Sequence, residues 1–336
     1  MKIVQFLEET IWRRFVAEHL GGSVFHTPEM FQVFARTKGH QPAMWAAVDS
    51  DGQRVLALLL PVQITLIGGL LRRLTTRAVV YGSVLCEPGP AGTEALAVLL
   101  RTYVQEVGRE VLFTELRNLS DLSPIQSTLT DCGFVYEGHL NYLIDLDRPV
   151  EEIMQGIGAR TRKNIRRGLR RGEVVIEEIV TREQIPLCYG VLRKTYAAAR
   201  VPLADYSLFE AAFDILYPRG MIRFVLARVG DAWAGTSVEL LYKDIVYGWY
   251  GGVDREYSDY APNELLMWHI LQWSAEHGYR TYDFGGAGKP DEEYGVRDFK
   301  AKFGGELVSF GRNTYTHAPW MRWVSEQGYR LLRRWL

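Results

Sequence analysis

The sequence predicts an α/β (α+β) fold in two tandem halves, each built on a mixed sheet. In both halves a run of strands is followed by one amphipathic helix and one further strand: helix 93–107 precedes strand 111–116, and helix 263–277 precedes strand 281–284. Strands that meander and then take a single helical crossover form a mixed sheet rather than a fully parallel one. The repeated order indicates a duplicated unit, with a boundary near Pro149.

The elements of the first half follow from apolar periodicity, which is 3.6 residues in a helix and 2 in a strand. Thr27-Pro28-Glu29 has the form of an N-cap with proline at the first helical position, so a helix is expected to start there. In chain order we expect helix 8–19, the helix after Thr27, strands 43–48, 55–66 and 78–85, helix 93–107, strand 111–116, helix 123–131, and strands 134–136 and 142–146.

The second half repeats this order after a basic segment. Gly230-Asp231 and Lys243-Asp244 are turn signals that join three strands. We expect a basic helix within 150–172, strand 174–179, helices 182–199 and 207–217, strands 222–229, 236–242 and 245–251, helix 263–277, and strands 281–284 and 308–315. The expected domains are 1–149 and 150–316, followed by an amphipathic C-terminal helix at 317–336.

One apolar run, residues 55–71, has two interpretations. It is shorter than the roughly 20 residues that a membrane-spanning helix needs, and Pro61 and the Gly68-Gly69 pair interrupt it. Two core strands joined through a glycine turn fit this pattern. Arg72-Arg73 follow directly, which likewise does not fit a spanning helix. The alternative is a patch that touches a membrane.

Composition limits the classes of function. With 336 residues, 47% of them hydrophobic, the chain can bury two cores. Its 39 basic and 40 acidic residues nearly cancel, which argues against coating of nucleic acid by the whole surface. Cys86, Cys132 and Cys188 are far apart, as in buried thiols of a reducing compartment. Acids and arginines near the N-terminus do not fit a signal peptide, so a cytoplasmic protein is expected.

Positive charge is concentrated in one segment, 158–172, which has seven Arg or Lys and no acid. On a helix, one apolar side faces a core, formed by Ile153, Ile157, Ile165 and Leu169. A row of cations faces outward, comprising Arg162, Lys163, Arg166 and Arg170. We interpret this row as an anion-binding surface. The alternative is a solvated basic helix face.

The element order of the second half resembles the core of the GNAT acyltransferase fold. Ordinary GNAT proteins bind the pyrophosphate of coenzyme A on a glycine-rich turn that opens the long helix. Here no glycine stands between Gly252 and Gly278. An acyl-CoA donor is therefore not expected at this helix.

Five short motifs are more specific, and residues 140–172 add to them. The motifs, in order, are Tyr250-Gly251-Gly252, Asn263-Glu264-Leu265-Leu266, Tyr282-Asp283-Phe284-Gly285-Gly286, Phe299-Lys300 and Phe303-Gly304. Together they resemble the FemABX peptidyltransferases, which build peptidoglycan bridges. The resemblance covers nearly the whole chain and implies two tandem GNAT-like domains. Because no long heptad run is present, it implies no long coiled-coil arm.

The resemblance also implies a reaction. Members of the family move an aminoacyl group from aminoacyl-tRNA to an amine of a UDP-linked or lipid-linked muramyl peptide, and relatives use other amines. No cofactor is then expected, since aminoacyl-tRNA is a co-substrate. The basic row (Arg162, Lys163, Arg166 and Arg170) would bind tRNA or the phosphates of the acceptor.

Two residues are expected to be catalytic. Lys300 stands at the lysine position of the family and would stabilise an oxyanion or a phosphate; the alternative is a surface lysine on a short helix. Asp283 follows a strand, where sites gather, and would accept a proton or bind the α-ammonium group of the donor. The alternative for Asp283 is a structural cap of Gly285-Gly286.

Six residues are expected to bind substrate. By resemblance, Arg200 stands at a position associated with the acceptor's phosphates, and Lys38 lies near the basic position of the first domain, for which Arg36 is the alternative. Paired Arg and Lys are chemically suited to a diphosphate. The others are expected to line the same cleft or to aim the lysine: Tyr206, Tyr250, Asn263 and Phe299. No metal site is expected, because the seven histidines show no metal-ligand spacing.

Two other functions and one surface stay open. One is an acyl-CoA-dependent GNAT acting on a polysaccharide or small amine, and the other is a non-catalytic RNA-binding protein. The aromatic, basic C-terminal segment, with Trp320 and Trp323, either packs on its own domain or makes peripheral contact with the inner face of the cytoplasmic membrane.

Overall fold

The computed structural model describes residues 1–108 and 110–333. The chain forms two compact units: unit 1 comprises Met1–Gly138 and Phe310–Leu336, and unit 2 comprises His139–Ser309. The last three residues of the helix expected at 317–336 lie outside the described residues.

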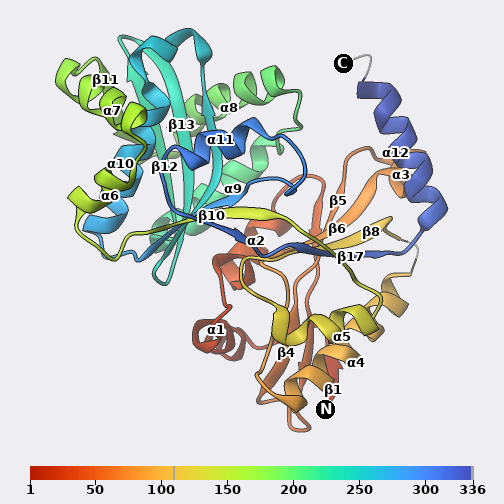
Figure 1. Cartoon of the computed structure of the whole chain (residues 1–336). Helices are drawn as coiled ribbons and strands as arrows, with labels where there is room; N and C mark the ends of the chain where they lie inside the picture. The colour runs from red at the N-terminus through yellow and green to blue at the C-terminus, as the bar shows by residue number, and fades with distance from the viewer. Residues whose placement is uncertain (109, 334–336) are drawn as a thin grey trace. The chain divides into compact units, whose positions relative to one another are not determined.

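Unit 1 contains two sheets, with strand orders β1-β3-β4-β7 and β2-β5-β6-β8-β17-β9 (Figure 1). Its strands are β1 (Lys2–Val4), β2 (His40–Pro42), β3 (Trp45–Val48), β4 (Val55–Leu59), β5 (Val62–Thr65), β6 (Thr76–Tyr81), β7 (Leu85–Cys86), β8 (Phe113–Arg117), β9 (Val135–Glu137) and β17 (Arg312–Thr316). Its helices are α1 (Glu9–Glu18), α2 (Pro28–Ala35), α3 (Arg72–Thr75), α4 (Pro90–Val107), α5 (Gln126–Asp131) and α12 (Pro319–Arg333).

The run at 55–71 divides at Pro61, which has no backbone N–H to continue a ladder. Before it β4 pairs with β3 and β7, and after it β5 pairs with β2 and β6. Leu58 and Val62 are buried on the two sides of the proline. The run therefore forms two core strands, as expected, but they are not a hairpin: β4 and β5 belong to different sheets and join at Pro61 instead of through the Gly68-Gly69 turn. The turn beyond β5 exposes Leu66 and Ile67.

Unit 2 is one seven-stranded sheet of order β11-β12-β13-β14-β15-β10-β16. Its strands are β10 (Leu140–Asp145), β11 (Val174–Glu178), β12 (Ile222–Val229), β13 (Ala232–Tyr242), β14 (Ile245–Val253), β15 (Thr281–Gly286) and β16 (Glu306–Ser309). Its helices are α6 (Val150–Gly156), α7 (Ala159–Arg171), α8 (Ile185–Ala199), α9 (Tyr206–Leu216), α10 (Pro262–Glu276) and α11 (Gly295–Ala301).

Helices cover both faces of the unit 2 sheet. Val225 of β12 belongs to the core that α6, α7 and α10 share. Its neighbour Phe224 instead contacts Phe213 of α9, with ring centroids 6.0 Å apart. Because successive strand residues point to opposite faces, α10 and α9 lie on opposite sides of the sheet (Figure 1).

The predicted duplication is visible in the strand pairing. Each unit has one parallel pair of strands linked through a long helix: β6 and β8 flank α4, and β14 and β15 flank α10. All the other strand pairs between described residues are antiparallel. Both sheets that contain a parallel pair are therefore mixed, as expected.

The division of the chain differs from the expected boundary at Pro149. Strand β10 pairs with β15 and β16, so it belongs to unit 2. The strand expected at 308–315 is two strands, separated at Gly311, whose φ of 72° breaks the ladder. The first, β16, completes unit 2, and the second, β17, returns to unit 1 and pairs with β8 and β9.

The basic segment also differs from the single helix expected. It forms α6 and α7, which meet at Ile157 and Gly158. Ile165 is fully buried, but Leu169 is 56% exposed. Gly168, not Leu169, contacts α10. A Cβ on Gly168 would clash with Leu265 of that helix.

Candidate active site

The parallel strands β14 and β15 separate near the middle of unit 2. They pair only at Ile245 with Thr281, Val246 with Tyr282, and Tyr247 with Asp283. Beyond these pairs β14 continues to Val253 and β15 to Gly286. A bulge in the pairing of β13 with β14 lies at the same level. Separating carboxyl ends of parallel strands are where α/β folds gather their sites.

Asp283 lies at this point of separation and is 5% exposed. Its Oδ1 accepts hydrogen bonds from the Gly285 amide (2.7 Å) and from Asn141 Nδ2 (3.3 Å). Burial raises the pKa of Asp283 to about 6, although these hydrogen bonds and Lys300 favour the ionised form. Asp283 therefore caps the Gly285 amide, as the structural alternative expected. Its carboxyl also has a pKa close to neutrality.

Lys300 of α11 is buried, so it is not the surface lysine of the alternative interpretation. Its Nζ donates to the carbonyl oxygens of Phe284 (2.6 Å), Gly285 (3.1 Å) and Gly286 (2.8 Å). An ammonium has three protons, and these three bonds use all of them. Burial lowers the pKa of Lys300 to about 8, while Asp283 raises it.

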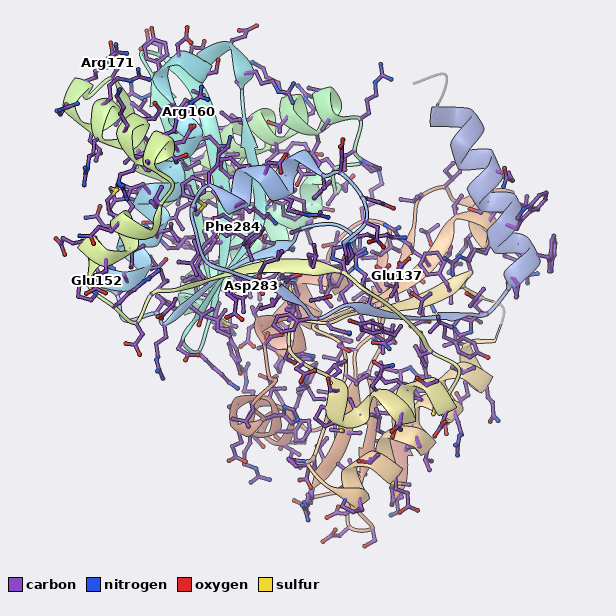
Figure 2. The ribbon with its side chains drawn as sticks, in the orientation of Figure 1. Glu137, Glu152, Arg160, Arg171, Asp283 and Phe284 are labelled. Carbon is purple, nitrogen blue, oxygen red and sulfur yellow. The ribbon has the colours of Figure 1, made fainter. Side chains whose placement is uncertain are left out.

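The two expected catalytic residues thus hold the same piece of backbone. Asp283 binds the amide of Gly285, and Lys300 binds three successive carbonyl groups that begin at Phe284. Figure 2 labels Asp283 and Phe284 on β15. Chemically, a carboxyl with a pKa near neutrality can accept a proton from a bound amine, while the fully bonded ammonium supplies fixed positive charge.

Tyr250 lies on β14 beyond the separation and faces α8 and α9. Its ring centroid is 4.9 Å from that of Phe209, 5.1 Å from Trp249 and 6.0 Å from Tyr196. Burial raises the pKa of Tyr196 to about 12, and nearby Tyr294 adds to the effect. The sequence did not single out Tyr196, because a tyrosine late in an amphipathic helix is indistinguishable from a packing residue.

Tyr206 and Arg200 lie at the junction of α8 and α9. The Tyr206 ring is 5.2 Å from Tyr189, which is 5.5 Å from Phe209, so an aromatic series joins Tyr206 to Tyr250. Arg200 ends α8 with a φ of 53° and is exposed. Tyr206 is thus linked to Tyr250 through two intervening rings, and Arg200 lies on the surface.

Asn263 and Phe299 have different surroundings. Asn263 is in the first turn of α10, where no side chain caps the helix and Pro262 supplies no N–H. Phe299 packs against Phe303 with centroids 5.1 Å apart, at the edge of the core beneath β15. Phe299 therefore fixes α11 by packing, which in turn holds the adjacent Lys300.

The basic row lies on α7, which packs against α10. Lys163, Arg166 and Arg170 are exposed, whereas Arg162 is half-buried and donates from Nη1 to the carbonyls of Gln155 (2.6 Å) and Ile157 (3.2 Å). Figure 2 labels Arg160 and Arg171, which mark the two ends of α7.

Arg162 therefore caps α6, and the other three side chains of the basic row are presented to solvent. The amide of Gly158, just before α7, donates to the Lys302 carbonyl (2.9 Å), which ties α7 to the segment after Lys300.

Lys38 belongs to unit 1, in the turn between α2 and β2, and is exposed. Two residues later His40 stacks on Phe34 (6.0 Å), which stacks on Tyr81 (5.3 Å). The guanidinium of Arg117 lies over the Tyr81 ring, 5.2 Å from its centroid.

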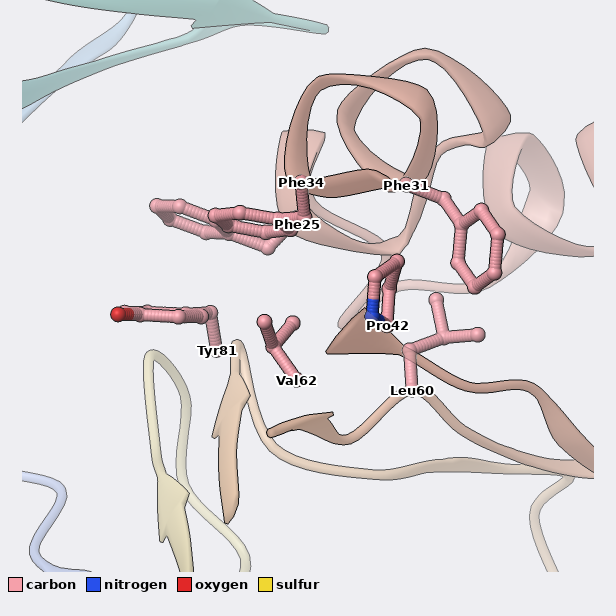
Figure 3. Close-up of a pocket in the computed structure, with 7 residues that line it drawn as sticks. All are labelled: Phe25, Phe31, Phe34, Pro42, Leu60, Val62 and Tyr81. Carbon is pink, nitrogen blue, oxygen red and sulfur yellow. The ribbon is translucent and has the colours of Figure 1, made fainter. Parts of the chain in front are cut away.

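These rings border a hollow in unit 1. Figure 3 shows the hollow between α2 and the strands, lined by Phe25, Phe31, Phe34, Pro42, Leu60, Val62 and Tyr81. The sequence did not predict it, because its residues come from four separate segments.

A second buried acid, Glu239 of β13, was missed by the sequence analysis. It is 1% exposed, accepts from Tyr282 Oη (3.1 Å) and from Ser237, and burial raises its pKa to about 7. Tyr282 reaches it across Gly248, where any side chain would block the way. The available signal was an acid between apolar neighbours in the strand segment Val238-Glu239-Leu240.

Within residues 1–108 and 110–333 no group of three or more His, Cys, Asp or Glu is arranged to hold a metal ion. No helix in this part of the chain is long and apolar enough to cross a bilayer.

Comparison with known proteins relates this geometry to a family. The Acetyltransferase (GNAT) domain family matches residues 159–300. A lipid II:glycine glycyltransferase of Staphylococcus haemolyticus (strain JCSC1435) is 37% identical over 62 residues, which are 17% of this chain and 15% of the relative. The chain thus matches less than a fifth of the length of this curated relative.

Solved structures match over much more of the chain. The crystal structure of FemX covers 97% of this chain and 100% of its own, with a TM-score of 0.73 and 16% identity. A tandem GNAT protein from the clavulanic acid biosynthesis pathway covers 94% and 98%, with a TM-score of 0.59 and 14% identity.

These findings confirm the fold and the resemblance that the sequence indicates. The chain has two tandem GNAT-like domains with mixed sheets, and it resembles the FemABX-type family. No long coiled-coil arm occurs among the described residues, in which the longest helix, α4, has 18 residues.

Proposed function

We propose that this chain is an aminoacyltransferase of the FemABX type, which moves an aminoacyl group from aminoacyl-tRNA to an amine of a UDP-linked or lipid-linked muramyl peptide. The observation that carries the proposal is the site between β14 and β15, where Asp283 and Lys300 hold the strand end within a fold like that of FemX. The local identity to a lipid II:glycine glycyltransferase supports the choice of acceptor.

The proposed reaction is aminolysis of an ester. The acceptor nitrogen bonds to the aminoacyl carbonyl carbon, the bond from that carbon to the ribose oxygen breaks, and a proton passes from nitrogen to the leaving oxygen. The carboxyl of Asp283, whose pKa is about 6, is ionised enough at neutral pH to receive this proton. Its contact with the Gly285 amide fixes its orientation.

In this mechanism Lys300 is a positioning residue, because it holds the main chain at the end of β15. Three carbonyl groups, those of Phe284, Gly285 and Gly286, would repel one another and a nearby oxyanion if nothing neutralised them. The ammonium of Lys300 gathers all three within 3.1 Å and leaves a positive charge beside the reacting centre. The charge favours the tetrahedral intermediate even without a direct hydrogen bond.

Unit 1 is proposed to bind a nucleotide group by itself. The stack of His40, Phe34 and Tyr81 ends under the guanidinium of Arg117. A planar base suits the rings, and phosphates suit the cations Arg117 and Lys38. A UDP-linked acceptor has both groups.

The second candidate is an acyl-CoA-dependent N-acyltransferase, which the GNAT domain match favours. A pyrophosphate at the start of α10 would meet Pro262, which donates no hydrogen bond, and Glu264, which is acidic and in the first turn. Both features weaken the anion site that a helix N-terminus otherwise provides. We therefore prefer the tRNA-dependent reaction.

Donor dependence tests the proposal directly. Purified protein is incubated with UDP-muramyl pentapeptide, labelled amino acid, total tRNA and aminoacyl-tRNA synthetases. Label on the pentapeptide that ribonuclease abolishes is the expected result. Turnover of acetyl-CoA without tRNA would instead establish the second candidate.

The basic row supplies a separate arm of this test. Replacement of Lys163, Arg166 and Arg170 by alanine is expected to raise the KM for aminoacyl-tRNA and to weaken its dependence on salt, because three phosphate contacts are lost. The fold should persist, since all three side chains are exposed. Arg219→Ala, in unit 2 but outside α7, is the matched control. An unchanged KM in the triple variant would contradict tRNA binding by this row.

A further inference from the structure

A group of large apolar side chains is exposed at one end of unit 1. On α12, Trp320 is 65% exposed, Trp323 63% and Val324 38%. In the segment that joins β5 to α3, Leu66 is 60% exposed, Ile67 48% and Leu71 49%. We call these six residues the tryptophan patch.

The two parts of the tryptophan patch belong to one surface. Ala318 and Met321 of the α12 region are buried in a small core with Leu112, and Leu74 of α3 packs against it. Figure 1 shows α12 and α3 side by side. The exposed side chains of both segments therefore flank the same packed contact.

The core of unit 1 buries only some of the apolar side chains of α12. Met321 faces the small core, and Trp320, Trp323 and Val324 stand at i, i+3 and i+4, which places them together on another side of the helix. Soluble proteins rarely expose a contiguous group of this kind unless something binds it. Two indole rings could have been buried instead, as Trp12 and Trp45 are in the same unit.

The segment that carries Leu66, Ile67 and Leu71 has charges of one sign. No Asp or Glu occurs between Arg54 and Glu87. Arg72 and Arg73 are exposed at the start of α3, directly after Leu71. A binding partner would therefore meet apolar side chains bordered by positive charge.

We propose that the tryptophan patch docks this chain on the surface of an anionic phospholipid bilayer. Indole rings favour the interface between headgroups and acyl chains, and α12 would lie along it without crossing the membrane. Arg72 and Arg73 would contact anionic headgroups. A second copy of the chain fits less well, because a symmetric contact would place the arginines of both copies together.

This inference deepens the proposed function, since a lipid-linked acceptor is held in the same bilayer. It does not need that function in order to be tested, because lipid binding is measured without any substrate. Failure of vesicle binding with intact transfer to UDP-muramyl pentapeptide would leave the transferase proposal standing. Vesicle binding without transferase activity would leave only the docking surface.

The test is co-sedimentation of the full chain with vesicles, at 0.15 M salt. Wild-type protein is expected to bind vesicles that contain phosphatidylglycerol and to bind pure phosphatidylcholine vesicles at least tenfold more weakly. Trp320→Ala with Trp323→Ala should lower binding at least tenfold. Each arginine near an anionic surface contributes about fivefold, so Arg72→Ala with Arg73→Ala should lower binding about 25-fold.

The matched control replaces Phe6 and Leu20 by alanine, which are 79% and 99% exposed in unit 1 but outside the tryptophan patch. This variant should bind like wild type. All variants should keep the wild-type melting temperature, because the replaced side chains are exposed. No binding by wild type, or equal binding by the tryptophan variant, would overturn the proposal. A doubled mass in light scattering that depends on both tryptophans would assign the patch to self-association instead.

Discussion

The sequence motifs identified residues of the site, but they did not predict which atoms those residues bind. Asp283 and Lys300 were selected from two motifs, and the structure places them around the same strand end. The sequence cannot reveal that all three protons of Lys300 reach main-chain carbonyls, because that depends on how α11 folds back on β15. Glu239 was missed for a related reason, since its partner Tyr282 is two strands away in the sheet.

Replacement of Lys300 by alanine should lower turnover at least tenfold, equivalent to about 1.4 kcal/mol of activation barrier. The reason is that the carbonyls from Phe284 to Gly286 lose their shared cation. Steady-state transfer to the pentapeptide measures it. Lys302→Ala, an exposed lysine two residues away, is the control and should be nearly wild type. A Lys300→Ala enzyme with the wild-type rate would remove Lys300 from the mechanism.

Glu239 should make stability depend on pH. Its pKa is about 7 in the folded chain and 4.5 in the reference state, so the folded chain keeps its proton over a range in which the unfolded chain loses it. The free energy of unfolding therefore falls as pH rises from about 4.5 to about 7 and does not recover above that range.

Glu239→Gln keeps an acceptor for Tyr282 and has no proton to lose. It should reduce this fall by an amount on the order of 3 kcal/mol. Denaturant unfolding at pH 5 and pH 8 measures it, with the exposed Glu306→Gln as control. The smaller fall that Asp283 contributes, between its reference pKa of 3.8 and about 6, should persist in Glu239→Gln. An identical pH dependence in wild type and Glu239→Gln would contradict a raised pKa.

At the scale of elements, the periodicity predicted most helices and strands but not how they divide. The basic segment splits at Gly158, whose amide bonds to Lys302, a residue far away in sequence. The strand expected at 308–315 splits because its two parts pair with different sheets. In both cases a long-range partner decides the local structure, and periodicity within a window does not contain that partner.

Strand β14 is expected to need glycine at position 248, because a side chain there would collide with Tyr282. A Cβ there would lie 2.6 Å from the hydroxyl of fully buried Tyr282, so Gly248→Ala should lower the free energy of unfolding by about 1–3 kcal/mol. Gly251→Ala on the same strand is the control, because its nearest neighbours would be 3.9 Å away. Thermal and denaturant unfolding measure both variants. In a Tyr282→Phe background the cost of Gly248→Ala should shrink, and an equal cost in the two backgrounds would argue against this contact.

For the whole molecule, the duplicated order of elements predicted the number and type of domains, but not the route of the chain. Unit 2 is continuous, whereas unit 1 is completed by a segment that follows unit 2. Strand β17 lies between β8 and β9, and its Asn313 is fully buried and accepts from Asn118 Nδ2 at 3.0 Å.

Separate fragments should therefore behave differently. The fragment 139–309 is expected to unfold cooperatively by itself, because its sheet and core are complete. The fragment 1–138 should not, because loss of β17 leaves the edges of β8 and β9 and the buried Asn118 without partners. Circular dichroism during denaturant unfolding measures both. Addition of a 310–336 peptide should restore cooperativity to 1–138, and cooperative unfolding of 1–138 alone would contradict the assignment of β17.

The amino-acid order was sufficient for the properties that short segments carry: mixed sheets, two similar halves, a basic helix, and an aspartate and a lysine in the motifs of a transferase family. These depend on side-chain period, turn residues and local composition, which neighbours along the chain specify. The folded structure alone settled which strands pair, where each unit ends, and what Lys300, Glu239 and Arg162 bind. Those outcomes depend on contacts between residues distant in sequence, whose free energy exists only once the chain has closed around them.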